Sequence, residues 1–161
     1  MPTDAVFLIS LLSATLLCSL VAGFLFAFAV VVMPGIKKLN DREYIRAFQV
    51  IDGVIQDNQW LFILVWVGSI VAILTLAAVA FNQPLVLIAM LAYILGVQLP
   101  TFTKNIPLNN NIQSLQIDSM EEAAVKMARV DFELRWNQWN TFRTLSASLV
   151  SALLMVLLYL H

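Results

Sequence analysis

The fold is decided by residues 58–103, which read NQWLFILVWVGSIVAILTLAAVAFNQPLVLIAMLAYILGVQLPTFT and contain no charged side chain. About 20 residues of α-helix cross the hydrocarbon core of a bilayer, so this stretch is long enough for two crossings. Asn82, Gln83 and Pro84 form a polar turn signal near its middle. We therefore predict two transmembrane helices, over residues 59–81 and 84–103.

Two further apolar stretches flank this hairpin. The first lies between Asp4 and Lys37 and predicts a span over residues 5–33, and the last predicts a span over residues 141–160. We do not expect the first to be a cleaved signal peptide, because no Lys or Arg precedes it and its apolar run is longer than an h-region. The prediction is an all-α fold, an integral membrane four-helix bundle that forms a single domain over residues 1–161.

The composition leads to the same class. The sequence is 61% hydrophobic and 12% charged, whereas soluble domains are about 45–50% apolar and about 25% charged. A soluble chain of 161 residues has too little interior to bury so much apolar surface. These figures exclude a disordered chain, a nucleic-acid-binding protein and a secreted disulfide scaffold.

The chain has one cysteine, Cys18, and one histidine, His161. A lone cysteine excludes an internal disulfide and a dithiol relay, and Cys18 is either a packing residue or a reactive thiol. A histidine at the last position is typical of a solvated chain end rather than of a metal ligand or a catalytic base. We therefore expect no metal site and no cofactor.

The basic residues are confined to two connections. All of them lie between the first and second spans or between the third and fourth, at positions 37, 38, 42, 46, 104, 126, 129, 135 and 143. Short connections rich in Lys and Arg stay in the cytoplasm. The sequence thus predicts a plasma (inner) membrane protein with both termini outside and both charged connections in the cytoplasm.

Both charged connections show helical patterns. They predict two additional cytoplasmic-side helices, over residues 41–56 and 120–140. We expect Asp41 to be the N-cap of the first helix. Ser119 and Glu122 have the spacing of a capping box for the second helix, which can continue into the last span because it contains no Gly or Pro.

Polar side chains recur on one face around the start of the last span. Arg129, Glu133, Trp136, Asn140 and Arg143 follow one another at steps of four and three residues. One interpretation divides them into surface groups, with Trp136 at the membrane interface and Arg143 reaching out to the headgroups. The other places Asn140 and Arg143 inside the bundle, where an amide and a guanidinium need polar partners.

Candidate partners lie at the same level in other segments. Gln98 and Thr101 close the third span around Pro100, which we expect to kink the helix and free backbone carbonyls. Gln49 and Asp52 lie three residues apart on the first connecting helix and supply an amide and a carboxylate. The polar groups therefore converge at one end of the predicted bundle.

The segment that follows the third span contains Pro107, flanked by Asn105 and Asn109. A residue before proline disfavours the α conformation, so we expect the helix to end here. The two asparagines either cap this helix end or bind a ligand.

Four motifs along the chain share one family resemblance. They are Gly23-Phe24-Leu25-Phe26-Ala27-Phe28 with Val32-Met33-Pro34-Gly35, then Phe48-Gln49-Val50-Ile51-Asp52, then Asn105-Ile106-Pro107-Leu108-Asn109, and the Trp-x-x-x-Asn-x-x-Arg pattern of Trp136, Asn140 and Arg143. Together they resemble the anthrone oxygenase family of small four-helix membrane proteins, formerly a domain of unknown function. Asp52 departs from the family pattern, which carries Asn more often at this position.

The resemblance implies an oxygenase that converts an anthrone to an anthraquinone with molecular oxygen and without a metal or organic cofactor. In such a site we assign Arg143 to the oxyanion, Asn140 and Asn109 to orientation of the substrate, Trp136 to stacking and Asp52 to the base. The further substrate-binding candidates are Asn105, Gln49, Gln98 and Thr101.

A second function stays open beside the oxygenase. The chain could be a non-enzymatic membrane protein that binds, carries or senses a small lipophilic molecule, or assists a membrane complex, because this function needs only an apolar cavity with a polar mouth. In both cases the expected partners are the lipid bilayer and a small hydrophobic ligand or substrate. A homo-oligomer is left open, and no nucleic acid is expected.

Overall fold

The structure, a computed structural model, describes residues 2–57 and 59–161, with only the backbone of residues 2–4. The described residues form helices joined by short connections, and they contain no strand. Four helical stretches are long and apolar enough to cross a membrane: Ala5–Ile36, Trp60–Val79, Pro84–Gln113 and Glu122–Leu160. The predicted all-α membrane bundle is therefore confirmed.

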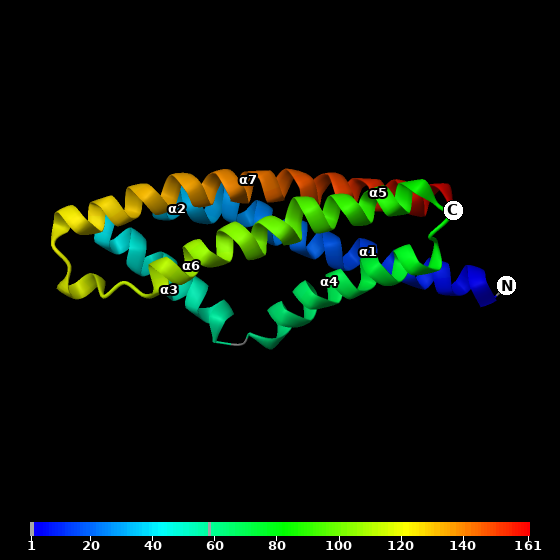
Figure 1. The fold of residues 1–161 in the computed structure, drawn as a ribbon, viewed down its shortest axis with the longest axis horizontal. Helices are drawn as coiled ribbons and strands as arrows, with labels where there is room; N and C mark the ends of the chain where they lie inside the picture. The colour runs from blue at the N-terminus through cyan, green and yellow to red at the C-terminus, as the bar shows by residue number, and fades with distance from the viewer. Residues whose placement is uncertain (1, 58) are drawn as a thin grey trace.

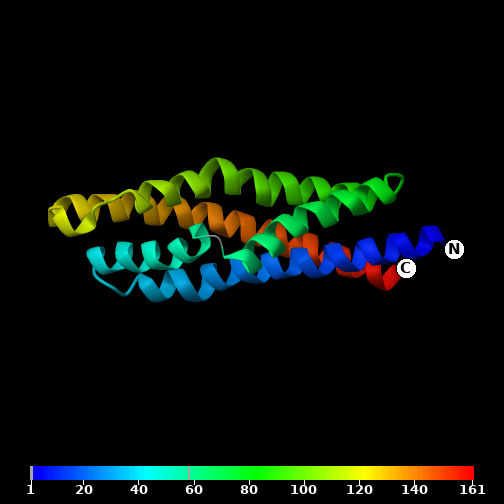
Figure 2. The same ribbon diagram turned by 90° about the horizontal axis from the view of Figure 1, so that it is seen from below.

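The helical elements follow one another along the chain as shown in Figures 1 and 2. In chain order they are α1 (Pro2–Ala27), η1 (Phe28–Val32), α2 (Met33–Ile36), α3 (Asp41–Gln56), α4 (Trp60–Val79), α5 (Pro84–Tyr93), η2 (Ile94–Gln98), η3 (Thr101–Asn105), α6 (Ile106–Gln113), η4 (Ile117–Ser119) and α7 (Glu122–Leu160). The elements η1, η2 and η3 are π-helical turns, and η4 is a turn of 3₁₀-helix.

The long helices lie lengthwise beside one another, with both termini and the α4–α5 hairpin at the same end (Figures 1 and 2). α1 packs along α4 and α7, and α5 packs along α7. α4 and α5 meet at their hairpin and diverge toward the other end, where α4 begins at Trp60 (Figure 2). α3 lies at this divergent end and packs on α6 and α7.

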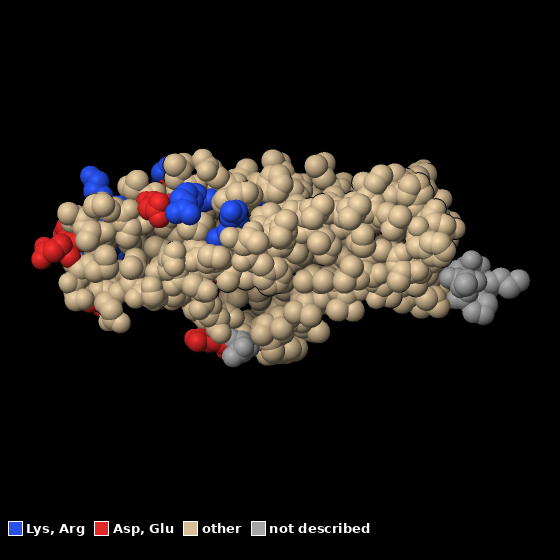
Figure 3. All heavy atoms as spheres, in the orientation of Figure 1, with Lys and Arg blue, Asp and Glu red and all other residues tan. Residues whose placement is uncertain are grey.

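Charged side chains gather around α3 and the first half of α7. On the face drawn in Figure 3, blue and red atoms occupy this end, and the part that surrounds the hairpin is uncharged. The core between α1, α4, α5 and α7 is apolar, and Cys18 is fully buried in it. In lipid, close packing of this kind holds helices together, since the surrounding acyl chains are as apolar as the core.

Each of the three π-helical turns ends two residues before a proline. The prolines are Pro34, Pro100 and Pro107, and the N–H that closes each turn bonds the carbonyl five residues earlier. A proline lacks the N–H for the i−4 carbonyl and crowds that carbonyl, and the wider turn relieves both effects. The expectation that Pro107 ends the helix is wrong, because the helical stretch continues from Pro84 to Gln113.

Two predicted caps are also wrong. Asn40, not Asp41, caps α3: its Oδ1 accepts the N–H of Glu43 at 2.9 Å, and the Glu43 carboxylate accepts the N–H of Asn40 at 3.4 Å. No capping box forms at Ser119, and α7 follows Glu121 without a side-chain cap. The second connecting helix is the first half of α7, which runs unbroken into the last span.

Arg129 fixes α3 against α7. Its guanidinium donates to the carbonyls of Lys37 and Leu39 at 2.8 and 2.9 Å, and to the carboxylates of Asp41 and Glu133 at 3.0 Å each. Lys37 and Leu39 belong to the chain between α2 and α3, so one side chain on α7 holds both ends of this connection. α3 is thereby held over the divergent end of the bundle.

Candidate active site

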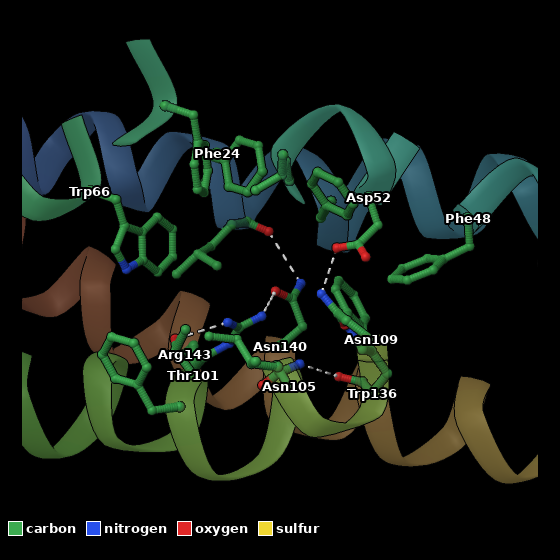
Figure 4. A pocket seen from close by; sticks show the side chains of 16 residues that line it. Phe24, Phe48, Asp52, Trp66, Thr101, Asn105, Asn109, Trp136, Asn140 and Arg143 are labelled. Carbon is green, nitrogen blue, oxygen red and sulfur yellow. Dashed lines mark hydrogen bonds between the residues drawn. The ribbon is translucent and has the colours of Figure 1, made fainter. Parts of the chain in front are cut away.

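A pocket lies inside the divergent end, where the first, third and fourth helical stretches meet α3 and α4. Its volume is about 160 Å³, close to the roughly 150 Å³ of an apolar cavity that accommodates benzene. It is lined by Phe24, Leu25, Phe28, Phe48, Asp52, Ile55, Phe62, Trp66, Thr101, Phe102, Asn105, Ile106, Asn109, Trp136, Asn140 and Arg143. Figure 4 shows these side chains converging from opposite sides on one space.

Aromatic rings form the walls of this pocket. Phe62 stacks on Trp66 with a centroid distance of 5.2 Å, and Phe24 lies 5.1 Å from Phe62. Phe24 also lies 4.9 Å from Phe28, which in turn lies 5.7 Å from Trp136, so the rings form one continuous series. Flat rings in these arrangements favour a flat aromatic guest, which can make the same offset and edge contacts.

Arg143 is a buried cation at one end of the pocket. The residue is 4% exposed, and it forms no salt bridge with any described carboxylate. Its Nη1 donates to Thr101 Oγ1 and its Nη2 to Asn140 Oδ1, both at 2.9 Å, whereas its Nε has no partner among the described residues. The guanidinium lies 5.9 Å from the ring centroid of Trp136. A buried cation held only by neutral groups favours a ligand that brings negative charge.

Two asparagines complete this polar wall. Asn140 donates from Nδ2 to the carbonyl of Leu25 at 3.2 Å, which links α7 to α1 and turns its Oδ1 toward Arg143. Asn105 donates from Nδ2 to the carbonyl of Trp136 at 3.5 Å, and its Oδ1 is buried with no partner in the described part of the chain. Arg143 Nε and Asn105 Oδ1 are thus a buried donor and a buried acceptor without partners among the described residues.

Asp52 lies in another part of the same pocket and accepts three amide hydrogen bonds. Asn109 donates to its Oδ1 at 2.7 Å, and Gln56 and Gln113 donate to its Oδ2 at 2.7 and 3.0 Å. In turn the indole N–H of Trp136 donates to Asn109 Oδ1 at 2.8 Å. Because every partner donates through an N–H, this network suits an ionised carboxylate, which only accepts. Figure 4 shows Asp52 and Arg143 on opposite sides of the labelled asparagines.

The family model described as anthrone oxygenase matches residues 54–154. The chain belongs to the anthrone oxygenase family. The matched range contains every pocket residue contributed by α4, η3, α6 and α7, together with Ile55 of α3. It excludes the pocket residues of α1 and η1, and Phe48 and Asp52 of α3. Neither the search of curated proteins nor the search of solved structures finds a match.

In this anthrone oxygenase family member, seven of the nine predicted site residues line the pocket and two do not. Gln98 accepts the indole N–H of Trp66 at 3.0 Å and so holds a wall residue in place. Gln49 donates to the carbonyls of Ile112 and Leu115 at 2.8 and 3.1 Å, which ties α3 to the end of α6. Both side chains lie outside the pocket lining and hold the elements around the pocket in place.

Of the aromatic wall residues, Trp136 was predicted as a site residue, and Phe24, Phe28, Phe62 and Trp66 were not. Phe24 and Phe28 are four residues apart, as are Phe62 and Trp66, so each pair lies on one helical face and was available as a signal. In apolar spans such pairs do not stand out from ordinary lipid-facing aromatics. Within the described residues, no group of three His, Cys, Asp or Glu side chains could hold a metal ion.

Proposed function

We propose that this protein is a cofactor-independent oxygenase that oxidises a flat, hydrophobic anthrone-like or phenolic molecule with molecular oxygen. The observation that carries the proposal is Arg143, a buried cation without a carboxylate partner beside an aromatic pocket. Membership in the anthrone oxygenase family supports the same reaction class.

An anthrone supplies all the electrons that this reaction needs. Loss of a proton from its methylene carbon gives an extended enolate, which transfers an electron to O₂, and a carbon–oxygen bond then forms at that carbon. The resulting hydroperoxide loses water and leaves a carbonyl group. One oxygen atom of O₂ enters the quinone, the other leaves as water, and the four electrons come from the former methylene group.

The proposed roles follow from the positions of the two charged groups. The carbonyl and the methylene carbon of an anthrone lie across its central ring from each other, as Arg143 and Asp52 lie across the pocket (Figure 4). Arg143 would bind the oxygen that becomes negative in the enolate, where a fixed donor in a dry site acts most strongly. Asp52 would accept the proton.

The neutral side chains would position the ring system. Trp136 offers a ring face, Asn109 links Trp136 to Asp52, and Asn140 orients the guanidinium. Asn105 Oδ1 would accept a hydroxyl group of a phenolic substrate.

Oxygen uptake by the purified protein tests the proposal. With anthrone as substrate, we expect one O₂ consumed per anthraquinone formed, at a rate above that of protein-free vesicles. Anthrone that binds in the pocket without oxygen uptake would contradict the oxygenase and favour the other predicted function, a protein that binds, carries or senses a lipophilic molecule.

A further inference from the structure

The pocket opens sideways between α4 and α6. On the α6 side, Phe102 and Ile106 line the pocket and yet are 57% and 36% exposed. On the α4 side, Phe62 lines the pocket and is half-buried. Figure 3 shows the surface hollowed on this face, where α4 diverges from α6 in Figure 1. The opening is therefore framed by apolar side chains.

Aromatic side chains mark where this opening lies relative to a bilayer. Trp60 at the start of α4 is 66% exposed, Trp139 on α7 is half-buried with Lys104 above its ring, and Tyr159 lies near the end of α7. At 1.5 Å per residue, Trp139 and Tyr159 are about 30 Å apart along α7, which matches the roughly 30 Å thickness of the hydrocarbon core. Trp and Tyr gather at both edges of that core.

The opening lies at the edge that Trp60 and Trp139 mark, with Ile106 two residues beyond Lys104 on the headgroup side and Phe102 two residues inward of it. Along α4, Phe62 and Trp66 lie about 3 and 9 Å inward of Trp60, and Arg143 lies about 6 Å inward of Trp139 along α7. On the side of Phe62 and Phe102 the opening is thus expected to face acyl chains, and at Ile106 it reaches the level of the headgroups. Asp52 lies on the connecting helix α3, toward the headgroup side.

The other end of the pocket is closed by α3. Phe48, Asp52 and Ile55 cover it from α3. Hydrogen bonds across α3 and α6 hold this cover: Gln49 donates to the carbonyl of Ile112, and Gln113 donates to the carbonyl of Gln49 at 2.9 Å and to Asp52. Entry from water would break several of these bonds, whereas entry from the side displaces only the side chains that frame the opening.

We infer that the pocket takes its ligand directly from the hydrocarbon layer of the membrane, through the opening between Phe62 on α4 and Phe102 with Ile106 on the α6 side. The inference deepens the proposed function, because it defines the substrate class as a membrane-dissolved molecule that is uncharged when it enters. A charged molecule would have to leave water for the acyl chains before it could reach Arg143.

The pocket volume agrees with a lateral route. The pocket volume of about 160 Å³ is smaller than the roughly 300–1,000 Å³ of ordinary ligand pockets. A molecule of three fused rings that places its polar end at Arg143 would therefore extend into the opening and contact Phe62 and Phe102.

Binding kinetics under nitrogen test the route without turnover. The protein is reconstituted in phosphatidylcholine vesicles, anthrone is added, and quenching of tryptophan fluorescence is followed. Widening the opening with Phe102→Ala should raise the association and dissociation rate constants together, and Ile106→Trp should lower both by about tenfold, with Kd changed much less. Leu99→Trp is the matched control, since Leu99 is exposed on the same helical stretch and does not line the pocket.

The variant Gln49→Ala loosens the α3 cover and so tests entry from water, the alternative to the lateral route. Rate constants that rise in Gln49→Ala and stay unchanged in Phe102→Ala and Ile106→Trp would overturn the lateral route. Anthrone that binds by the lateral route but is not oxidised in air would overturn the proposed oxygenase and leave the route standing.

If anthrone does not bind, the proposed function is contradicted and the lateral route is not. A measurement that needs no ligand then tests the route. In a protein that keeps only Trp66, lipids brominated on the acyl chains near the headgroup should quench its fluorescence more than aqueous iodide does. Trp66 quenched by iodide and not by the brominated lipids would overturn the inference.

Discussion

At the residue scale, the central feature is Arg143, a buried cation that we expect to lower the free energy of unfolding. Arg143 contacts Thr101, Asn140 and the ring of Trp136, and none of these carries a negative charge. Burial of a cation without a counter-ion costs several kcal/mol. A side chain kept for stability alone would have a carboxylate partner, as Arg129 does at Asp41 and Glu133.

The substitution Arg143→Met tests separately how the guanidinium affects catalysis and how it affects stability. We expect kcat/KM for anthrone oxidation to fall by about 10²–10³, the loss seen when one oxyanion donor is removed. The free energy of unfolding should stay the same or rise, because methionine fills the space without a charge. Oxygen uptake and thermal unfolding in detergent measure the two effects.

Arg135→Met is the matched control for this variant. Arg135 is an exposed arginine on the same helix, paired with Asp131 on the surface. Its replacement should change neither quantity. A fully active Arg143→Met protein would contradict the role of the guanidinium.

Asp52→Asn tests the proposed base. The amide keeps the shape of the side chain and loses the negative charge, so turnover should fall by about 10²–10⁴, as for loss of a general base. Gln113→Leu is the comparison, since it removes one donor to Asp52 and keeps the carboxylate. If both variants lose the same activity, Asp52 only positions α3 and Asn109, and the base lies elsewhere.

At the element scale, one glycine sets how closely two helical stretches approach. A Cβ at Gly96 in η2 would lie 2.7 Å from Cβ and Oγ of Ser146 on α7. Atoms of this kind do not approach so closely, so a larger residue has to push η2 away from α7. The stretch that carries Thr101 to Arg143 depends on this contact.

Gly96→Ala should therefore lower the free energy of unfolding by about 1–3 kcal/mol, the usual cost of overpacking. Thermal unfolding in detergent measures it. Gly23→Ala is the control, because a Cβ at Gly23 meets nothing within 4 Å and alanine favours a helix. Adding Ser146→Gly to Gly96→Ala should restore part of the loss, and a double variant less stable than Gly96→Ala would contradict the close approach.

The π-helical turn before Pro107 is expected to set the orientation of Asn105 and Asn109 relative to Thr101. Without the proline ring, Pro107→Ala allows an ordinary α-turn, which rotates Asn105 and Asn109 relative to Thr101 about the helix axis. We expect turnover to fall by about tenfold or more through misplacement, with helix content by circular dichroism unchanged. Pro84→Ala, in the first turn of α5 where no N–H is needed, should have little effect.

The four apolar helices and most polar residues of the candidate site could be predicted from the sequence. A helix that crosses a bilayer needs apolar side chains over a minimum length, so residues 58–103 are compatible with few folds. The steps between Trp136, Asn140 and Arg143 place these residues on one helical face. Pro107 shows the limit: a local rule predicts a helix end, and tertiary packing turns it into a wider turn. The approach of Phe62 and Trp66 to Phe24 depends on how α4 crosses α1, which no local pattern encodes.

At the scale of the whole molecule, the predicted orientation is open to a direct experiment. We propose that the α4–α5 hairpin faces outward and the charged end faces the cytoplasm, because the basic residues lie at that end. In a Cys18→Ser background, a membrane-impermeant maleimide should label Asn82→Cys in intact cells and Gln116→Cys only after permeabilisation. Labelling in the reverse order would contradict the orientation.

The unneutralised Arg143 also affects how the protein is made. An arginine in the middle of a translocating segment costs about 2.5–3.5 kcal/mol on insertion, and less near the edge where Arg143 lies. Its guanidinium donates to Asn140 on the same helix and to Thr101, both at 2.9 Å, and Thr101 belongs to the preceding span, which leaves the ribosome first. We therefore expect the last span to insert more easily while the third span is still beside the translocon, where Thr101 can bind the Arg143 guanidinium.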